Sequence, residues 1–373
     1  MTDPALKLMI PGPVQVEDDV LEAMAQPIQP HYGPQWREMY TETTGMLKTV
    51  FGTRGDVFLL VGSGCASIDA CLGSALATGE KLLIGANGFF GDRLRAIAES
   101  YGLDPVPVPA EWGRPLRPED FDAALARHPD VRLVAAVHVE TSTGIVNPVA
   151  EIGQVARRHG VPFMVDAVSS LGGLPVRMDD WGIDLCASAS QKCLGAPPGL
   201  APVAVGPGGW EAIDRHASVG HGWFLDLRVW RYYAREWGSW HPHPSTMPVN
   251  NVLALHTSVK SLLADGIESR LEHYQRLARR LRQGLRSIGM PPFTPDEFSA
   301  PVLTAAYGPQ GVPTSQIVEY LADVHHIKIA GGLGEGMVDR VFRVGHMAPA
   351  IGEADVDGVL AALACFRRDR GLA

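Results

Sequence analysis

The sequence predicts an α/β protein whose larger part is built on a mostly parallel sheet. From about residue 57, short apolar runs alternate with segments of helical spacing, and such repeats form parallel sheets through right-handed crossovers. Several of these runs end in polar residues, as expected where ligands bind at the carboxyl ends of parallel strands. The length of 373 residues exceeds what one compact core usually holds, so we expect a second domain.

The strands of this sheet are predicted from short apolar runs bounded by turn residues. The run from Val161 to Val165 is typical, because it is short enough for a buried strand and ends at Asp166. The predicted strands are 57–61, 81–86, 131–137, 161–166, 183–189 and 200–205. Helices are predicted where apolar residues recur on one side. They span 18–26, 68–77, 118–127 and 149–159.

The C-terminal part mixes helices and strands without this regular alternation. A long helical segment over 250–287 contains Gly266, where we expect a break or a join between two helices. Strands near 302–306, 327–330 and 340–347 and helices near 314–324 and 353–367 follow. We therefore expect an N-terminal arm (1–18), a large domain (19–250) and a smaller α+β domain (251–373).

The composition narrows the class of protein. The chain is 46% hydrophobic and 20% charged, as globular proteins are, and its net charge of −9 argues against a nucleic-acid partner. Five cysteines without a C-x-x-C spacing indicate a reducing compartment and no zinc site. His241 and His243 fit no standard zinc spacing and no third ligand is evident, so we expect no metal. Without a signal-peptide pattern or an apolar run of membrane-spanning length, we expect a cytoplasmic protein with no membrane partner.

Asp166 and Lys192 carry the strongest chemical signal. Each follows a short apolar run, where a predicted strand gives way to a loop. Taken singly, Asp166 could cap a turn and Lys192 could be a solvated surface lysine. A partly desolvated lysine at such a position can instead lose its proton and attack a carbonyl. Pyridoxal phosphate chemistry needs such a lysine, together with an acid that keeps the pyridine nitrogen protonated.

A turn of small residues after the first predicted strand is a candidate phosphate site. It contains Gly62, Ser63, Gly64 and Cys65 and opens a helix, whose free N–H groups and dipole favour an anion. The turn lacks the G-x-G-x-x-G and G-K-S/T patterns, so it is not a standard dinucleotide or nucleoside triphosphate loop. Alone it is a weak signal, because turns of this kind are common.

Two segments resemble a known family. VDAVSSLGG, from Val165, and SASQKCLGAPPG, from Ser188, closely resemble the class V aminotransferases of the fold-type I pyridoxal phosphate superfamily, of the alanine–glyoxylate and serine–glyoxylate type. The resemblance extends from Pro11-Gly12-Pro13 to Arg343-Val344-Gly345-His346. It implies a seven-stranded, mostly parallel sheet with helices on both faces, bound pyridoxal 5′-phosphate and a homodimer with shared active sites. In this family the N-terminal arm lies across the active site of a dimer partner.

The resemblance also implies roles for individual residues. Lys192 and Asp166 would be the catalytic pair, and Arg343 would bind the substrate carboxylate. Phe90 would stack on the cofactor ring, and Val168 would pack under it. The implied cofactor-binding residues are Ser63, Gly64, Cys65, Phe90, Thr141, Asp166, Val168, Gln191, Lys192, His243 and Thr246.

The cofactor phosphate would be bound by residues of both subunits. Ser63, Gly64 and Cys65 would surround the phosphate within one chain. Thr246 precedes an apolar residue and a proline, as in the family, and its hydroxyl would reach the phosphate of the other subunit's cofactor. His243 stands three positions earlier, where relatives carry tyrosine or a similar donor.

The implied reaction moves the amino group of a small amino acid, alanine or serine, to glyoxylate or pyruvate. KCLGAPPGL and the segment ending in GHM also resemble pyridoxamine–pyruvate aminotransferases, although Thr246 and the glycine turn at 62–64 speak against that branch. A β-lyase or cysteine desulfurase on the same fold is a second alternative. Desulfurases carry histidine before the lysine and a mobile cysteine loop, whereas Gln191 stands here and 331–336 contains no cysteine. A non-enzymatic regulator is a third alternative.

Overall fold

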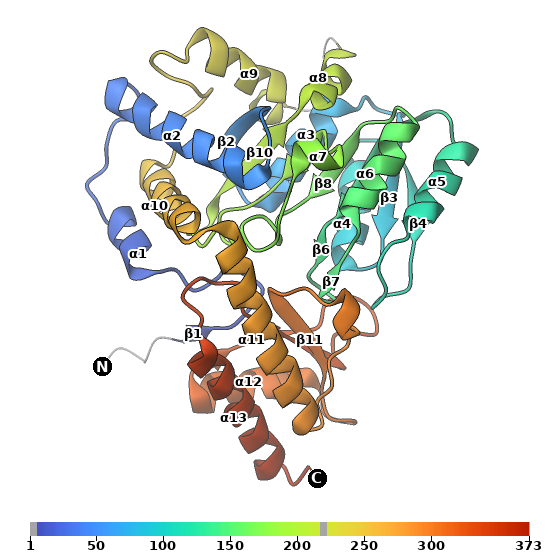
Figure 1. The fold of residues 1–373 in the computed structure, drawn as a ribbon, viewed down its shortest axis with the longest axis vertical. Coiled ribbons are helices and arrows are strands. Elements are labelled where there is room, and N and C mark those ends of the chain that lie inside the picture. The colour runs from blue at the N-terminus through green and yellow to red at the C-terminus, as the bar shows by residue number, and fades with distance from the viewer. Residues whose placement is uncertain (1–5, 217–221, 373) are drawn as a thin grey trace.

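The computed structural model describes residues 6–216 and 222–372, which form a large upper part and a smaller lower part in Figure 1. The sheet of the large part contains β2 (Asp56–Gly62), β3 (Lys81–Ala86), β4 (Asp104–Pro109), β5 (Val131–Val137), β8 (Phe163–Asp166), β9 (Leu185–Ala187) and β10 (Gly199–Val205). Their spatial order is β2-β10-β9-β8-β5-β3-β4. β10 alone runs in the direction opposite to that of the other strands of this sheet. The predicted seven-stranded, mostly parallel sheet is confirmed.

Helices cover both faces of this sheet. Every residue of β8 and all but one of β5 are buried, and successive side chains of a strand point to opposite faces. The covering helices are α2 (Pro34–Phe51), α3 (Gly64–Ala75), α4 (Phe89–Ser100), α5 (Pro118–Arg127), α6 (Val149–Arg158) and α10 (Val249–Asp265). Shorter helices complete this part: α1 (Asp18–Met24), α7 (Met178–Trp181), α8 (Pro207–Asp214) and α9 (Leu227–Glu236).

One strand of the sheet is absent from the sequence-based prediction. In β4, prolines at 105, 107 and 109 interrupt the pattern of a central strand. Proline lacks the N–H that a central strand must donate to its neighbour, but an edge strand tolerates it. β4 pairs only with β3 and forms the edge of the sheet, which explains how this sequence can be a strand.

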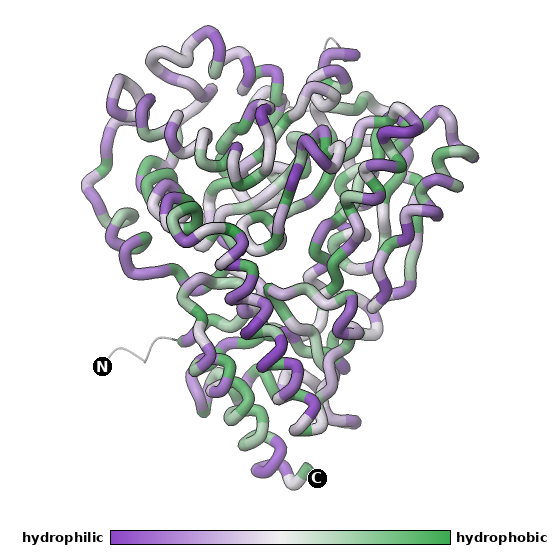
Figure 2. Tube along the Cα trace, in the orientation of Figure 1, coloured by the Kyte–Doolittle hydropathy of each residue, from purple (hydrophilic) through white to green (hydrophobic). Residues whose placement is uncertain are grey.

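The small part is an antiparallel sheet with three helices. β14 (Val341–Gly345) pairs with β11 (Leu303–Tyr307) and β13 (Ala330–Gly331). The helices are α11 (Ile267–Ser287), α12 (Thr314–His325) and α13 (Glu353–Asp369), and much of α11 is hydrophilic in Figure 2. β1 (Lys7–Leu8) pairs in parallel with β12 (Ile327–Lys328). The N-terminal arm is therefore attached to the small part.

Gly266 separates the two long helices, as the sequence suggests. Most of the buried apolar residues of α10 belong to the core of the large part, and most of those of α11 belong to the second core. The packing thus favours a division near Gly266, while the domain boundary after residue 250 stays a prediction. None of the helices within 6–216 and 222–372 is long and apolar enough to cross a membrane.

The topology brings several polar residues to one edge of the large sheet. β5, β8 and β9 are parallel neighbours, so their carboxyl ends lie at the same edge. β8 ends at Asp166, and the loop after β9 contains Lys192. β5 continues into β6 (Val139–Glu140), which pairs with β7 (Ile145–Val146). This edge is where a doubly wound sheet binds its ligands.

Candidate active site

Asp166 and Lys192 lie close together, as the sequence predicts. Burial raises the pKa of the Asp166 carboxyl to about 6, whereas the N–H of Val168, which donates to its Oδ1 at 2.8 Å, and the charge of Lys192 oppose the rise. Burial also lowers the pKa of Lys192 to about 8. The carboxyl therefore sits in a dry site with one hydrogen-bond donor, and the amine loses its proton far more readily than an exposed lysine.

The N-terminal arm covers Lys192. The Nζ of Lys192 donates to the carbonyl of Pro11, and the N–H of Val14 donates to the carbonyl of Gln191 at 3.1 Å. Gly12 has a φ of 90°, and a Cβ there would lie 2.5 Å from Cδ of Lys192, so only glycine fits. The resemblance places this arm across a partner's active site. In the structure the arm lies on the lysine of its own chain.

The predicted phosphate turn lies against the same group of residues. Ser63 precedes α3, and no side chain caps this helix start within the described residues. A Cβ on Gly64 would lie 2.7 Å from Cγ2 of Val168, so the turn is packed beside the residue that follows Asp166 by two positions. Ser63 is exposed and Cys65 is half-buried. The uncapped N–H groups are suited to a phosphate.

Phe90, Thr141 and Gln191 surround this edge. Phe90 is in the first turn of α4, and Thr141 follows β6. The Oε1 of Gln191 is buried and has no hydrogen-bond partner among the described residues. A buried polar atom without a partner usually marks the place of a missing group. The unsatisfied amide, the uncapped helix start, the buried acid and the half-buried lysine with its lowered pKa together fit pyridoxal phosphate.

Glu140 is a buried carboxylate for which sequence reasoning assigned no role. It accepts hydrogen bonds from the N–H groups of Phe90 (3.0 Å) and Gly91 (3.1 Å), and from the N–H and hydroxyl of Ser142 (3.0 and 2.6 Å). Burial raises its pKa, and these four donors oppose the rise. Glu140 thus ties the start of α4, which carries Phe90, to the end of β6. The sequence signal for Glu140 is weak: it is an acid in a polar stretch that follows the apolar strand over 131–137.

Arg343, in β14, reaches the active site from the small part. It is 7% exposed, and it donates to the carbonyls of Gly331 (2.8 Å) and Thr141 (3.2 Å). Burial lowers its pKa to about 10, although the charge of Glu140 opposes the fall. A second arginine, Arg93, was missed from the sequence. Its guanidinium carbon lies 4.9 Å from the centre of the Phe90 ring, and its charge lowers the pKa values of Asp166 and Lys192.

Within the described ranges, no hydrogen bond joins His243 or Thr246 to the other predicted site residues. His243 is fully buried, its Nε2 accepts from Nε1 of Trp36 at 2.9 Å, and its Nδ1 lies 2.8 Å from the carbonyl of Ser245. Both nitrogens are therefore engaged, and neither is left to donate to a phosphate. Thr246 is exposed, and its hydroxyl has no hydrogen-bond partner in the described ranges.

The structure also brings a third histidine to His241 and His243. His31, which the sequence does not connect with them, has a ring nitrogen within 4.8 Å of theirs. The rings of His241 and His243 lie 4.3 Å apart between centres. A third nitrogen is thus present, contrary to the sequence-based reasoning. The prediction that no metal binds stays a prediction, and the hydrogen bonds at both nitrogens of His243 favour it.

Comparisons with known proteins agree with this geometry. The family model described as aminotransferase class-V matches residues 10–338. An uncharacterized aminotransferase from Methanocaldococcus jannaschii is 37% identical over 358 residues, which cover 96% of this chain and 91% of that protein.

Two solved structures are also similar along the chain. That of an alanine–glyoxylate aminotransferase from Nostoc sp. has a TM-score of 0.93 and 31% identity, and the match covers 98% of this chain and 96% of that one. That of the ureidoglycine–glyoxylate aminotransferase from Bacillus subtilis has a TM-score of 0.93 and 30% identity, with 100% and 95% covered. The chain belongs to the class V aminotransferases of fold type I and is a pyridoxal phosphate-dependent transaminase.

Proposed function

We propose that this transaminase moves the amino group of alanine or serine to glyoxylate or pyruvate, and that Arg343 binds the carboxylate of each in turn. The observation that carries the proposal is the state of Arg343. Its guanidinium is 7% exposed and donates to two carbonyl groups, yet it forms no ion pair within the described residues. A buried arginine that forms no direct ion pair, close to the proposed catalytic lysine, suits a substrate carboxylate.

Glyoxylate is the acceptor because both solved relatives described above carry it in their names. Alanine is the first donor to test because one of these two relatives carries it in its name, and serine differs from alanine by one hydroxyl group. Donor and acceptor share a carboxylate next to the reacting carbon. One arginine at a fixed position therefore serves both halves of the exchange.

Lys192, Asp166 and Arg343 would each have a separate role in the reaction. The bound cofactor supplies a conjugated ring that takes up the electrons of the broken bond to the α-hydrogen. Nζ of Lys192, with its lowered pKa of about 8, would take the proton from the substrate α-carbon and deliver it again. The Asp166 carboxylate would keep a proton on the ring nitrogen. Arg343 would hold the substrate so that its α-hydrogen points at Lys192.

We assign the remaining cofactor contacts from the positions described above. Phe90 and Val168 would lie on the two faces of the ring. Phe90 is in the first turn of α4, and Val168 follows Asp166 by two positions. The start of α3 would bind the phosphate through its free N–H groups. The side chains assigned to the phosphate or the ring edge are Ser63, Cys65, Thr141 and Gln191, with Gly64 giving close approach of the backbone.

The proposed active form is a homodimer in which Thr246 contacts the phosphate bound by the partner. The exposed hydroxyl of Thr246, which has no partner within its own described chain, supports this assignment. His243 stays a candidate phosphate contact only if its hydrogen bond with Trp36 or Ser245 is replaced by one to the phosphate. We also propose a cytoplasmic location, because all five cysteines are free and three of them are buried as thiols.

The test compares Arg343→Ala with Arg280→Ala in the cofactor-loaded enzyme. Arg280 is a matched control because it is an arginine of the small part whose ion pair with Asp357 lies at the surface. Alanine and glyoxylate should yield pyruvate and glycine. For donor and acceptor alike, Arg343→Ala should cost about 2–5 kcal/mol of transition-state stabilisation, as measured from kcat/KM, because it removes the proposed charge partner of both carboxylates. Arg280→Ala should leave the rate within about twofold.

Other outcomes separate the alternatives. If alanine and serine fail to react but free pyridoxamine reacts with pyruvate, the chain is a pyridoxamine–pyruvate aminotransferase. If serine releases ammonia, or cysteine releases sulfide, without any oxo-acid acceptor, it is a β-lyase or desulfurase. Equal losses in the Arg343 and Arg280 variants would contradict the carboxylate assignment while leaving the reaction itself in place.

A further inference from the structure

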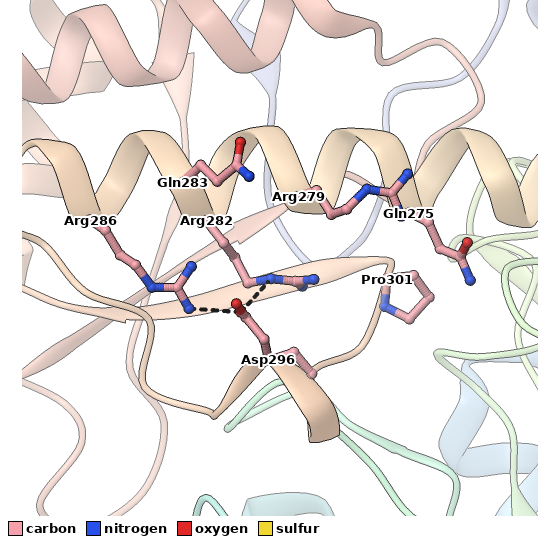
Figure 3. A pocket seen from close by; sticks show the side chains of 8 residues that line it. Gln275, Arg279, Arg282, Gln283, Arg286, Asp296 and Pro301 are labelled. Carbon is pink, nitrogen blue, oxygen red and sulfur yellow. Dashed lines mark ion pairs between the residues drawn. The ribbon is translucent and has the colours of Figure 1, made fainter.

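A pocket rich in arginine lies in the small part, between α11 and the loop that carries Asp296 and Pro301 (Figure 3). Its volume is about 470 Å³. Arg279, Arg282 and Arg286 line it from the helix. Their spacing of three and four residues places them on one face of α11. None of these residues belongs to the active site described above.

The lining residues of this pocket carry more positive than negative charge. Oδ1 of Asp296 pairs with Nε of Arg282 at 3.0 Å and with Nη2 of Arg286 at 2.8 Å, so one carboxylate serves two guanidinium groups (Figure 3). Arg279 has no ion pair or hydrogen bond among the residues the structure describes. Three arginines against one aspartate leave two uncompensated positive charges, in a chain whose net charge is −9.

Arg282 is the one buried arginine of the three. It is 8% exposed, yet its one hydrogen bond, from Nη1 to the carbonyl of Ala300, is long at 3.4 Å. Its Nε is buried and, although paired with Asp296 by charge, has no hydrogen bond of good geometry. Burial lowers its pKa, and the neighbouring Arg286 and Arg279 add to the fall. A guanidinium has five N–H donors, so most of those of Arg282 lack an acceptor in the described structure.

We propose that this pocket binds a phosphate dianion, either inorganic phosphate or the phosphate group of a small monoester. Two negative charges would balance the surplus, and oxygen acceptors would satisfy the free donors of Arg282 and Arg279. Gln275 and Gln283, which also line the pocket, offer amide groups for the rest of such a molecule. The volume exceeds that of one phosphate group and leaves room for a small ester.

Arg343 does not line this pocket, but hydrogen bonds join the edge of the pocket to the segment that contacts Arg343. Ala300, which accepts from Arg282, donates its N–H to the carbonyl of Gly144 at 2.8 Å. The hydroxyl of Thr294 donates to the carbonyl of Thr143 at 2.6 Å. These carbonyls belong to the segment that begins at Thr141, the residue whose own carbonyl accepts from Arg343. The proposed site is therefore a second anion site beside the active site.

Calorimetric titration of the cofactor-loaded enzyme with inorganic phosphate, at constant ionic strength, tests the proposal. Loaded enzyme is needed because the cofactor then blocks its own phosphate site. We expect one site per chain, with affinity that weakens as salt is raised. Arg279→Gln should weaken binding about tenfold, because it removes a charge-assisted contact from an exposed position that folding does not require. Arg276→Gln is the matched control, an exposed arginine of the same helix outside the pocket.

Glycerol phosphate shows whether the pocket prefers a phosphate monoester to inorganic phosphate, and acetate is the control for an unselective anion site. A monoester that binds more tightly than inorganic phosphate would identify the pocket as a site for a phosphorylated small molecule, and the reverse order would identify free phosphate. Either result supports the proposal if Arg279→Gln weakens it and Arg276→Gln does not. Binding of phosphate no tighter than acetate, or equal binding in the two variants, would overturn it.

Discussion

Two buried carboxylates lie near the same edge of the large sheet, and they are held in opposite ways. Glu140, at the end of β6, accepts four hydrogen bonds from within the chain. Asp166, at the end of β8, accepts one, from the N–H of Val168. Burial raises the pKa of both. The difference is that the chain completes the site of Glu140 and leaves that of Asp166 to be completed by a ligand.

We infer that this difference separates a structural carboxylate from the proposed catalytic one. A buried charge must be compensated, either by the fold or by something that binds later. Glu140 is compensated by the fold and fixes the start of α4. In the proposed site, Asp166 would gain its partner from the protonated ring nitrogen of the bound cofactor. Substitution of Asp166 should therefore affect the reaction more than the fold, and substitution of Glu140 should affect the fold more than the reaction.

The largest effect is expected on turnover of Asp166→Asn. An asparagine keeps the shape of the side chain but cannot hold the ring nitrogen protonated by charge. We expect kcat with alanine and glyoxylate to fall by about 100-fold or more, as when a preorganised charge interaction is removed. The assay is made at saturating cofactor. A loss of less than tenfold would mean that Asp166 and Glu140 do not differ in the way described.

A second prediction concerns the stability of the cofactor-free protein against pH. The pKa of Asp166 is higher in the folded chain, about 6, than its ordinary value of 3.8. The folded chain thus holds this proton more tightly, so stability present below about pH 4 is lost as pH rises through 6. This contribution is roughly 3 kcal/mol. Urea unfolding between pH 4 and 7 should show a weaker pH dependence for Asp166→Asn than for the wild type, and identical slopes would contradict the assignment.

Glu140→Gln should mainly reduce stability. The amide keeps one acceptor oxygen but brings an NH₂ group against backbone N–H donors, so about 1–3 kcal/mol of unfolding free energy should be lost. Glu99→Gln, an exposed acid on α4, is the control and should stay within about 0.5 kcal/mol. Urea denaturation of the three proteins measures this. Should Glu140→Gln be as stable as the control, the four hydrogen bonds would not hold the start of α4 as inferred.

The smallest effect is expected for Thr246→Val, which removes one hydroxyl group and keeps the shape. If this hydroxyl contacts a partner's phosphate, the Kd for the cofactor should rise about fivefold, the value of one hydrogen bond of about 1 kcal/mol. Thr41→Val, at an exposed position of α2, should leave the Kd unchanged. Fluorescence titration of the cofactor-free proteins measures the difference. Equal Kd values would remove Thr246 from the proposed shared site.

The elements of the fold could be predicted from the sequence because their signals are local. The helix over 118–127 and the strands over 81–86 and 131–137 appear with the predicted bounds. Asp166 and Lys192 could be paired because each follows an apolar run and parallel strands end together. β4 could not be predicted as a strand, because a strand tolerates its prolines only at the edge of a sheet, and the sequence does not reveal that β4 lies at the edge.

The missed residues depend on contacts between distant segments. The N–H donors of Phe90 and Gly91 lie 50 and 49 positions before Glu140, so no local pattern marks the acid that binds them. His31 is likewise distant in sequence from His241 and His243. The family resemblance located Gly12 in the arm but not its contact with Lys192 of the same chain. Sequence located the groups that follow strands, and the structure was needed for the groups that hold them.

The most direct test of the account is to locate the cofactor on the chain. The loaded enzyme is reduced with borohydride, digested, and the modified lysine is identified by mass spectrometry. We expect the label on Lys192 alone, and no label in Lys192→Ala treated in the same way, because this half-buried lysine lies near Asp166 and burial lowers its pKa to about 8. A stoichiometric label on any other lysine, or equal labelling of the variant, would contradict the assignment of the active site.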